Sequence, residues 1–229
     1  MMSFFKKFRA TAPNDIRAER FIQSLYSETH VDYPSVKHSL DWSTKRRHLD
    51  FLHNFVNALK PKVIIETGTF EGHGTYAMAA AAHANDNHAR IFTIDYDGDP
   101  IQDAKGSVSQ EQWLALKHIR QSHLETIKNK FPNCMVTFVE GDSREVLPVL
   151  LDTIDQWDFW YQDSMHFAEG IQQEWEIMEA KAAVNATIIF DDISKKNRFS
   201  RWFKANYKRS WRFAPRRDFG HKQCLAQKK

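Results

Sequence analysis

Hydrophobic and polar residues are arranged in blocks along this chain, and the blocks predict strands and helices in alternation. After residue 60, short apolar runs typical of buried strands are separated by longer segments with apolar residues at helical spacing. The predicted strands are 63–65, 90–95, 134–140, 157–162, 186–190, 211–214 and 221–226, and the predicted helices are 76–82, 109–127, a segment after 143, 167–183 and 195–208. This alternation is typical of an α/β fold with a mostly parallel sheet that ends in an antiparallel pair.

Residues 1–60 show helical spacing without intervening strands. One helix is predicted from Asn14 or Asp15 to Tyr26, and a second from Ser43 or Thr44 to residue 60. The second must end there, because the residue before Pro61 avoids helical backbone. We therefore expect a helical N-terminal cap of residues 1–60 and one domain of residues 61–229. The aromatic and histidine side chains of the cap could line a substrate pocket, although packing against the core is the simpler interpretation.

Composition and charge narrow the class of protein. With 229 residues, seventeen Phe, seven Trp and six Tyr, the chain can bury a substantial core. Its two cysteines, Cys134 and Cys224, lie far apart, which favours a reduced cytoplasmic setting, and no stretch approaches the ~20 apolar residues of a membrane span. The net charge is +3, but residues 193–229 carry thirteen Lys or Arg and one acid. A basic end of this kind can indicate an anionic partner.

The stretch V-I-I-E-T-G-T-F-E-G-H-G-T, residues 63–75, joins a buried strand to a helix through a turn that contains Gly68, Gly72 and Gly74. Glycines allow positive φ and let a ligand lie close to the backbone. The order E-x-G-x-x-x-G, which begins at Glu66, differs from the dinucleotide fingerprint G-x-G-x-x-G. It resembles motif I of class I S-adenosylmethionine-dependent methyltransferases. The alternative is an ordinary strand-to-helix turn in another α/β protein.

The resemblance implies a Rossmann-like class I methyltransferase fold, with a seven-stranded sheet and S-adenosylmethionine beyond the carboxyl ends of its strands. Asp95, which closes the second strand, would accept hydrogen bonds from the ribose, with Asp97 as the alternative. Asp142 and Ser143 would contact the adenine, and helix capping is their alternative role. The expected cofactor contacts are Glu66, Gly68, Phe70, Gly72, Asp95, Asp142, Ser143 and Asp163.

Three acids follow two successive predicted strands, namely Asp163 after the fourth strand and Asp191 and Asp192 after the fifth. Carboxylates that converge repel one another unless a cation lies among them, and oxygen ligands suit Mg²⁺. The segments W-Y-Q-D-S-M-H-F-A-E-G and I-I-F-D-D-I resemble the metal-dependent O-methyltransferases of the catechol and macrocin types. The resemblance implies that these three acids bind Mg²⁺ or a similar ion and that His166 is the base. Helix capping or packing is the alternative role of His166.

The resemblance covers residues 63–194 and the final strand pair, and Glu174 stands where the macrocin-like pattern has aspartate. The expected activity is metal-assisted methyl transfer from S-adenosylmethionine to a hydroxyl of a small molecule, such as a sugar, a natural product or a catechol. One alternative is a metal-independent RNA methyltransferase that uses the basic C-terminal face with Trp202, Tyr207 and Trp211. Another is a non-catalytic α/β binding module. We expect weak nucleic-acid binding at most and no membrane association, and we leave open whether the chain forms a homo-oligomer.

Overall fold

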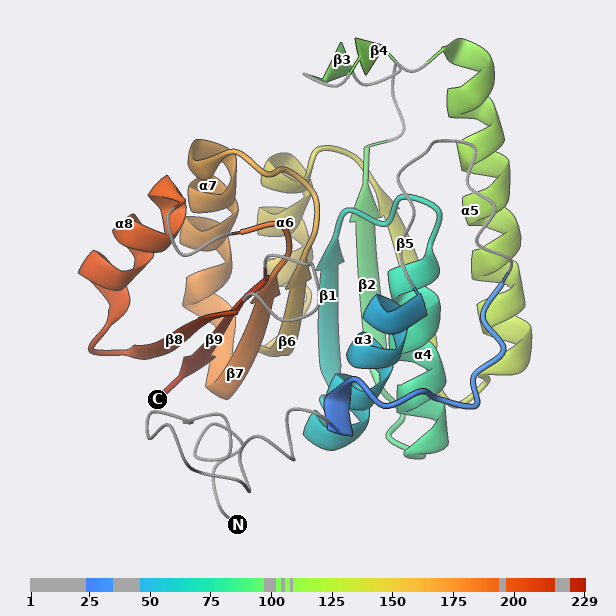
Figure 1. Cartoon of the computed structure of the whole chain (residues 1–229), viewed down its shortest axis with the longest axis horizontal. Coiled ribbons are helices and arrows are strands. Elements are labelled where there is room, and N and C mark those ends of the chain that lie inside the picture. The colour runs from blue at the N-terminus through green and yellow to red at the C-terminus, as the bar shows by residue number, and fades with distance from the viewer. Residues whose placement is uncertain are drawn as a thin grey trace. The chain divides into compact units, whose positions relative to one another are not determined.

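The structure is a computed structural model (Figure 1), and it describes residues 24–34, 46–96, 102–103, 106–107, 109–193, 197–216 and 223–229. Side chains are described for all of these except 102–103, 106–107, 213–216 and 223. The chain forms two compact units. The first consists of residues 1–61, 70–89 and 99–135, and the second of residues 62–69, 90–98 and 136–229.

The second unit is built on a mixed sheet. In the described part of the chain this sheet has seven strands, in the order β5-β2-β1-β6-β7-β9-β8. Strands β2, β1, β6 and β7 run parallel, and β9 pairs antiparallel with both β7 and β8. The strands are β1 (Val63–Thr67), β2 (Arg90–Asp95), β5 (Met135–Glu140), β6 (Trp157–Gln162), β7 (Ala182–Phe190), β8 (Trp211–Arg216) and β9 (Gln223–Lys228). The predicted mostly parallel sheet of seven strands is confirmed.

Strand β1 lies between β2 and β6. All five of its residues are buried, as its unbroken run of β-branched residues predicts for a strand covered on both faces. The last two, Glu66 and Thr67, are polar, and they are still only 1% and 0% exposed. Polar side chains buried at the carboxyl end of the middle strand need partners, and those partners define the candidate site described below.

Three helices of the second unit lie side by side against this sheet (Figure 1), in the order α6 (Ser143–Asp152), α7 (Ala168–Met178) and α8 (Arg198–Tyr207). A cluster of large aromatic side chains fills the space between α7, α8 and the sheet. Trp211 stacks on Trp157, with ring centroids 6.3 Å apart, and meets Trp175 edge-on at 4.8 Å. Trp202 and Tyr207, on the basic helix α8, are partly buried against the same cluster. The aromatics considered for RNA stacking therefore contribute to the core.

The predicted helix 167–183 is wrong at its C-terminal end. Helix α7 ends at Met178, a short 3₁₀ turn η1 (Glu179–Lys181) follows, and Ala182 already belongs to β7. The alanines at this point favour helix locally, but Ala182 pairs with Trp157 of β6 and is buried there, so packing in the sheet overrides propensity. Other predicted boundaries move by a few residues only: α8 begins at Arg198, and β9 extends to Lys228.

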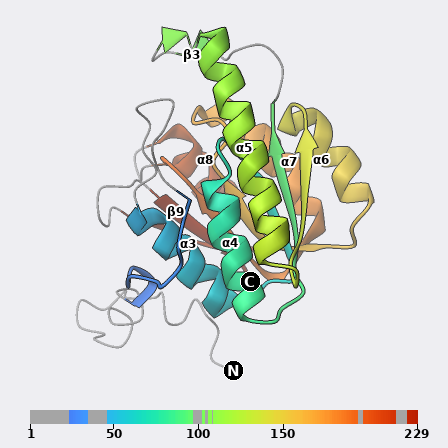
Figure 2. The same cartoon turned by 90° about the vertical axis from the view of Figure 1, so that its right-hand side faces the viewer.

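The first unit contains helices α3 (Arg46–Leu59), α4 (His73–Ala84) and α5 (Gln110–Lys130), together with a two-stranded pair, β3 (Gln102–Asp103) and β4 (Gly106–Ser107). Helix α4 packs against both α3 and α5 (Figure 2). The capping box of Ser109 and Gln112 at the start of α5 is confirmed. The predicted helix starts at Asn14 or Asp15 and at Ser43 or Thr44 lie outside the described residues. The division into a cap of residues 1–60 and a domain of residues 61–229 stays a prediction.

None of the described helices is long and apolar enough to cross a membrane. Both cysteines are buried free thiols. Burial raises the pKa of Cys134 and of Cys224 to about 12, so neither is activated as a nucleophile. The sulfur of Cys224 instead donates to the carbonyl oxygen of Ile193 at 3.1 Å.

Candidate functional site

Five strand ends place acidic side chains along one edge of the sheet. Because the carboxyl ends of parallel strands lie at the same edge, residues that end these strands or follow them come together there. Most of the predicted site residues of the second unit occupy such positions. They are Glu66 in β1, Asp95 at the end of β2, Asp142 and Ser143 after β5, Asp163 after β6, and Asp191 and Asp192 after β7.

Backbone hydrogen bonds continue past the strand ends and hold this edge together. Thr67 O accepts the Asp163 N–H at 2.8 Å, and Gln162 O accepts the Asp191 N–H at 2.9 Å. On the other side of β1, Ile94 O accepts the N–H of Gly68 at 2.9 Å. Asp163 and Asp191, the first acids after β6 and β7, are therefore fixed by their own backbone N–H groups.

Gly68 is required at this edge for two separate reasons. Its φ is +92°, in the left-handed region that favours glycine. A Cβ at this position would also lie 2.3 Å from the carbonyl oxygen of Asp163 and 2.7 Å from the backbone nitrogen of Ser164. The glycine thus lets β1 approach the loop that follows β6, which carries Asp163 and, three residues later, His166.

Glu66 is fixed by a chain of hydroxyl groups. Thr93 Oγ1 donates to Glu66 Oε2 at 2.6 Å, and the Thr93 and Thr69 hydroxyl oxygens lie within hydrogen-bond distance of each other. Glu66 and both threonines are buried. The carboxyl group of Glu66 is therefore held at this edge in a position set by β2.

Asp163 lies in an environment that disfavours its charged form. Burial and the nearby carboxylates of Asp191, Glu66 and Asp192 raise the pKa of Asp163 well above its usual range. Tyr161 Oη opposes this effect by donating to Asp163 Oδ2 at 2.9 Å. Negative charge thus accumulates around Asp163, and a cation would relieve the repulsion.

The other three residues of the predicted chemistry differ in exposure, and Asp163 itself is partly exposed. Asp191 is 8% exposed, whereas Asp192 is exposed and has a left-handed φ of +50°. His166 is also exposed. Among the described residues, no three His, Cys, Asp or Glu side chains are arranged as ligands of one metal ion. Asp191 thus lies near enough to Asp163 to raise its pKa. The described residues do not, however, form a metal site of three carboxylates.

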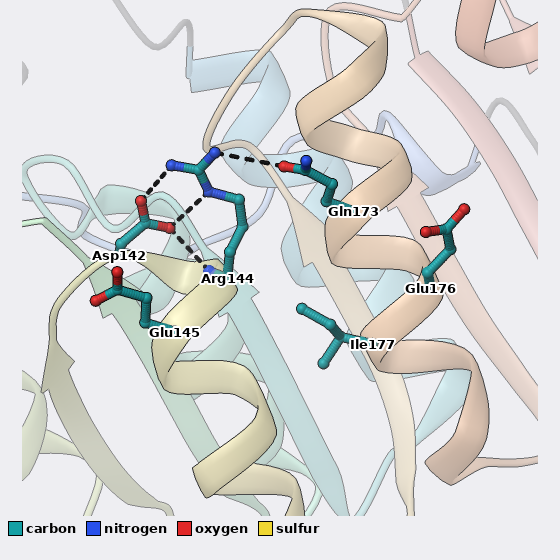
Figure 3. A pocket seen from close by; sticks show the side chains of 6 residues that line it. All are labelled: Asp142, Arg144, Glu145, Gln173, Glu176 and Ile177. Carbon is teal, nitrogen blue, oxygen red and sulfur yellow. Dashed lines mark hydrogen bonds and ion pairs between the residues drawn. The ribbon is translucent and has the colours of Figure 1, made fainter.

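Asp142 caps helix α6 and pairs with an arginine. Its Oδ1 accepts the backbone N–H and the Nε–H of Arg144, both at 2.9 Å, and Arg144 also forms an ion pair with its second oxygen. These bonds hold the pKa of Asp142 below its usual range, chiefly through the guanidinium hydrogen bonds. Asp142 and Arg144 line a surface groove of about 650 Å³ together with side chains of α7. Figure 3 shows the residues that line it. Capping, which was the alternative for Asp142 and Ser143, is observed for Asp142.

Ser143 has a different role. It is buried, and its hydroxyl donates to Oε1 of Glu174 on helix α7. The same oxygen accepts the Ser164 hydroxyl at 2.7 Å. Glu174 is 0% exposed, and burial raises its pKa. One buried carboxylate thus joins the turn after β5 to the loop after β6.

Phe70 and Gly72, the remaining predicted cofactor contacts, lie in the first unit. Phe70 has a left-handed φ of +50° and packs against Trp113 and Leu116 of α5. Gly72 has a φ of +84° and precedes helix α4 as its N-cap. Asp97, the alternative ribose contact, lies outside the described residues.

Sequence reasoning missed the contacts that four side chains make with the predicted site residues: Thr93, Tyr161, Arg144 and Glu174, of which Glu174 was noted only as a departure from the macrocin-like pattern. Two of them could have been found. Tyr161 stands two residues before Asp163, and Arg144 two residues after Asp142, so local spacing pointed to both. Thr93 and Glu174 are 27 and 31 residues from their partners, and only the fold brings them there.

Comparisons with known proteins agree with this geometry. A family described as a methyltransferase domain matches residues 65–193, more than half of the chain. Among solved structures, an O-methyltransferase from Bacillus cereus in complex with S-adenosylhomocysteine has a TM-score of 0.60 at 15% identity, over 98% of this chain and 96% of that chain. An S-adenosylhomocysteine-bound methyltransferase from Podospora anserina has a TM-score of 0.58 at 14% identity, over 81% and 80%.

A third structure is an O-methyltransferase from Streptomyces achromogenes that is involved in tomaymycin synthesis, in complex with S-adenosylmethionine. Its TM-score is 0.56 at 14% identity, over 82% of each chain. At these identities the likeness shows the fold. No curated protein matches the chain.

The buried Glu174 gives a prediction for stability against pH. Its pKa is raised above the ordinary value of 4.5, so the folded state binds this proton more tightly than the unfolded state. The stabilising contribution is complete below about pH 4.5 and is lost as pH rises through the raised pKa. Urea denaturation at a series of pH values measures this loss. As pH rises, the free energy of unfolding of the natural chain should fall relative to that of the Glu174→Gln variant. A difference between the two chains that stays constant with pH would contradict the prediction.

Proposed function

The chain belongs to the methyltransferase domain family, as an S-adenosylmethionine-dependent methyltransferase of the class I fold, and we propose that its acceptor is a hydroxyl group of a small molecule. The observation that carries the proposal is the row of acids along the carboxyl edge of β2, β1, β6 and β7. In doubly wound sheets this edge is where ligands bind. We further propose that Mg²⁺ or a similar divalent ion assists the reaction.

Several of these acids suit the cofactor, whose sulfonium and amino group are positively charged. Glu66 offers a buried acidic side chain, and Asp95, half-buried at the end of β2, offers an acceptor for the ribose hydroxyls. Asp142 and Ser143 lie after β5, where the family resemblance places the adenine. Gly68 lets the turn after β1 approach the backbone of Asp163. These roles, with Phe70 and Gly72 in the turn, are our proposal for cofactor binding.

The donor chemistry of Asp163 and Asp191 fits a divalent ion. Mg²⁺ prefers oxygen ligands and in substrate sites is commonly bound through one or two carboxylates, which agrees with a pair of carboxylates here. Asp163 and Asp191 would hold the ion, and Asp192, exposed on a left-handed residue, could reach it as a third ligand. When bound, the cation would stabilise negative charge on the acceptor oxygen.

His166 is placed to accept the proton of the acceptor hydroxyl. It follows Asp163 by three residues, and it is exposed, so an acceptor hydroxyl can reach its ring. In the proposed step an imidazole nitrogen takes the hydroxyl proton while the oxygen attacks the methyl carbon. The new bond is O–CH₃, the broken bond is S–CH₃, and the products are the methyl ether and S-adenosylhomocysteine. The chain itself contributes in-line positioning of the two reactants.

Labelled methyl transfer tests this proposal. The purified chain is incubated with methyl-labelled S-adenosylmethionine and fractionated small-molecule extract, with and without Mg²⁺, and in parallel with RNA. Metal-dependent label in a small-molecule fraction is the expected result. Label in RNA would favour the alternative that uses the basic C-terminal face, and cofactor binding without transfer to any fraction would favour a non-catalytic module.

Asp95→Ala should weaken binding of S-adenosylhomocysteine by about a hundredfold or more. The substitution removes hydrogen bonds from two ribose hydroxyls to a charged acceptor, on the order of 1.5–3 kcal/mol each. Calorimetry measures the affinity, and Asp152→Ala, an exposed acid at the end of α6, is the matched control. Unchanged affinity in the Asp95 variant would remove Asp95 from the ribose site.

Asp191→Ala and His166→Ala should separate the metal role from the proton role. The Asp191 variant, like chelation, should abolish label incorporation and leave S-adenosylhomocysteine affinity nearly unchanged. The His166 variant should lower the rate by about 10²–10⁴-fold, the usual contribution of a general base. A rate that resists both chelation and Asp191→Ala would refute the metal hypothesis, and a fully active His166 variant would assign the base elsewhere.

A further inference from the structure

Glu174 is a completely buried acid that contacts two of the site loops through Ser143 and Ser164. The proposed mechanism gives it no role. We propose that Glu174 is a positioning residue for methyl transfer, which holds the β5–α6 turn and the β6–α7 loop in one fixed arrangement. The inference rests on the proposed function, because it assigns Glu174 a role within that same site.

The hydrogen bonds of Glu174 carry the proposal. Its Oε1 accepts both the Ser143 hydroxyl and the Ser164 hydroxyl. Ser143 begins helix α6 directly after Asp142, and Ser164 directly follows Asp163. A single oxygen atom on α7 therefore links the turn proposed to contact the adenine with the loop that carries Asp163 and His166.

The network extends to the end of strand β6. Gln162 Nε2 donates to Ser164 Oγ at 3.3 Å and to Met165 O at 3.0 Å. Gln162 and the Ser164 hydroxyl thus fix residues 162–165 relative to Glu174. The conformation of the backbone just before His166 is set by this network.

A carboxylate at this position is a poor choice for packing alone. Glu174 is 0% exposed, and in the described part of the chain no donor meets good hydrogen-bond geometry at its Oε2, although Gln162 lies near enough to lower the pKa of Glu174 by hydrogen bonding. A buried oxygen without a donor is destabilising, and an apolar side chain of similar volume would avoid that loss. The hydrogen bonds to the two loops are what an apolar residue could not supply.

Helix α7 also reaches the β5–α6 turn at the surface (Figure 3), where Arg144 approaches Gln173 at 3.4 Å. This contact is long and exposed, so it should contribute little. Gln173 is the chain neighbour of Glu174 and serves as a matched control. If the buried link is the one that matters, replacing Gln173 should leave the site unaffected.

The test compares Glu174→Ala, Glu174→Gln and Gln173→Ala for S-adenosylhomocysteine affinity and for methyl-transfer rate. The alanine variant should weaken affinity by about tenfold and lower the rate further, because small misplacements of reacting groups reduce rates strongly. The glutamine variant keeps an oxygen that accepts both hydroxyls, so its affinity and rate should stay within about threefold of the natural values. The Gln173 variant should match the natural chain.

Coupling between the two serines separates positioning from a general loss of stability. The affinity effects of Ser143→Ala and Ser164→Ala should be non-additive in the natural chain, because both hydroxyls act through one oxygen. The same two effects should become additive in the Glu174→Ala background. Additive effects in both backgrounds, or a glutamine variant as impaired as the alanine variant, would overturn the proposal.

Hydrogen exchange provides a readout that needs no ligand. In Glu174→Ala the backbone amides of residues 141–144 and 163–167 should lose protection together, and in Gln173→Ala they should not. Unchanged protection in both segments would overturn the link itself. A natural chain that binds no S-adenosylhomocysteine would instead contradict the proposed function, and the exchange result would still decide whether Glu174 joins the two loops.

Discussion

The site depends on how closely strand β1 approaches the backbone that follows β6. Thr67 O accepts the N–H of Asp163 at 2.8 Å, and the Cα of Gly68 lies so near that an added Cβ would be 2.3 Å from Asp163 O. Asp163 receives its position from this contact, and Asp191 is fixed in turn through the carbonyl of Gln162. The backbones of Asp163 and Asp191 are thus placed by main-chain hydrogen bonds, and the side chain of Asp163 is held in addition by Tyr161.

Acidic side chains are concentrated along this edge of the sheet. Neighbouring side chains stabilise some of them by hydrogen bonds or an ion pair. Hydroxyl groups hold Glu66 and Asp163, through Thr93 and Tyr161 respectively, and a guanidinium holds Asp142. Asp163 still lies among carboxylates that raise its pKa well above the usual range. This excess of acidic groups around Asp163 suits positively charged ligands, namely the sulfonium cofactor and the proposed divalent ion.

Much of this could be predicted from sequence, because the relevant signals are local. The apolar run before Glu66, the acid at the end of each strand and the capping box at Ser109 are each contained within a few residues. What failed depended on distant partners. Ala182 joins a strand because Trp157 pairs with it, and Glu174 gains its role from serines 10 and 31 residues away. Local propensity contains no information about such contacts.

The most direct test compares the free energies of unfolding of Gly68→Ala and Gly72→Ala. Both glycines have left-handed φ angles, +92° and +84°, so both variants carry similar backbone strain, about 1–3 kcal/mol. Only at Gly68 does a Cβ collide with backbone, at 2.3 Å, whereas at Gly72 its nearest neighbour is His123 Cβ at 3.6 Å. The Gly68 variant should therefore lose clearly more stability in urea denaturation. Equal losses in the two variants would contradict the close approach on which the site depends.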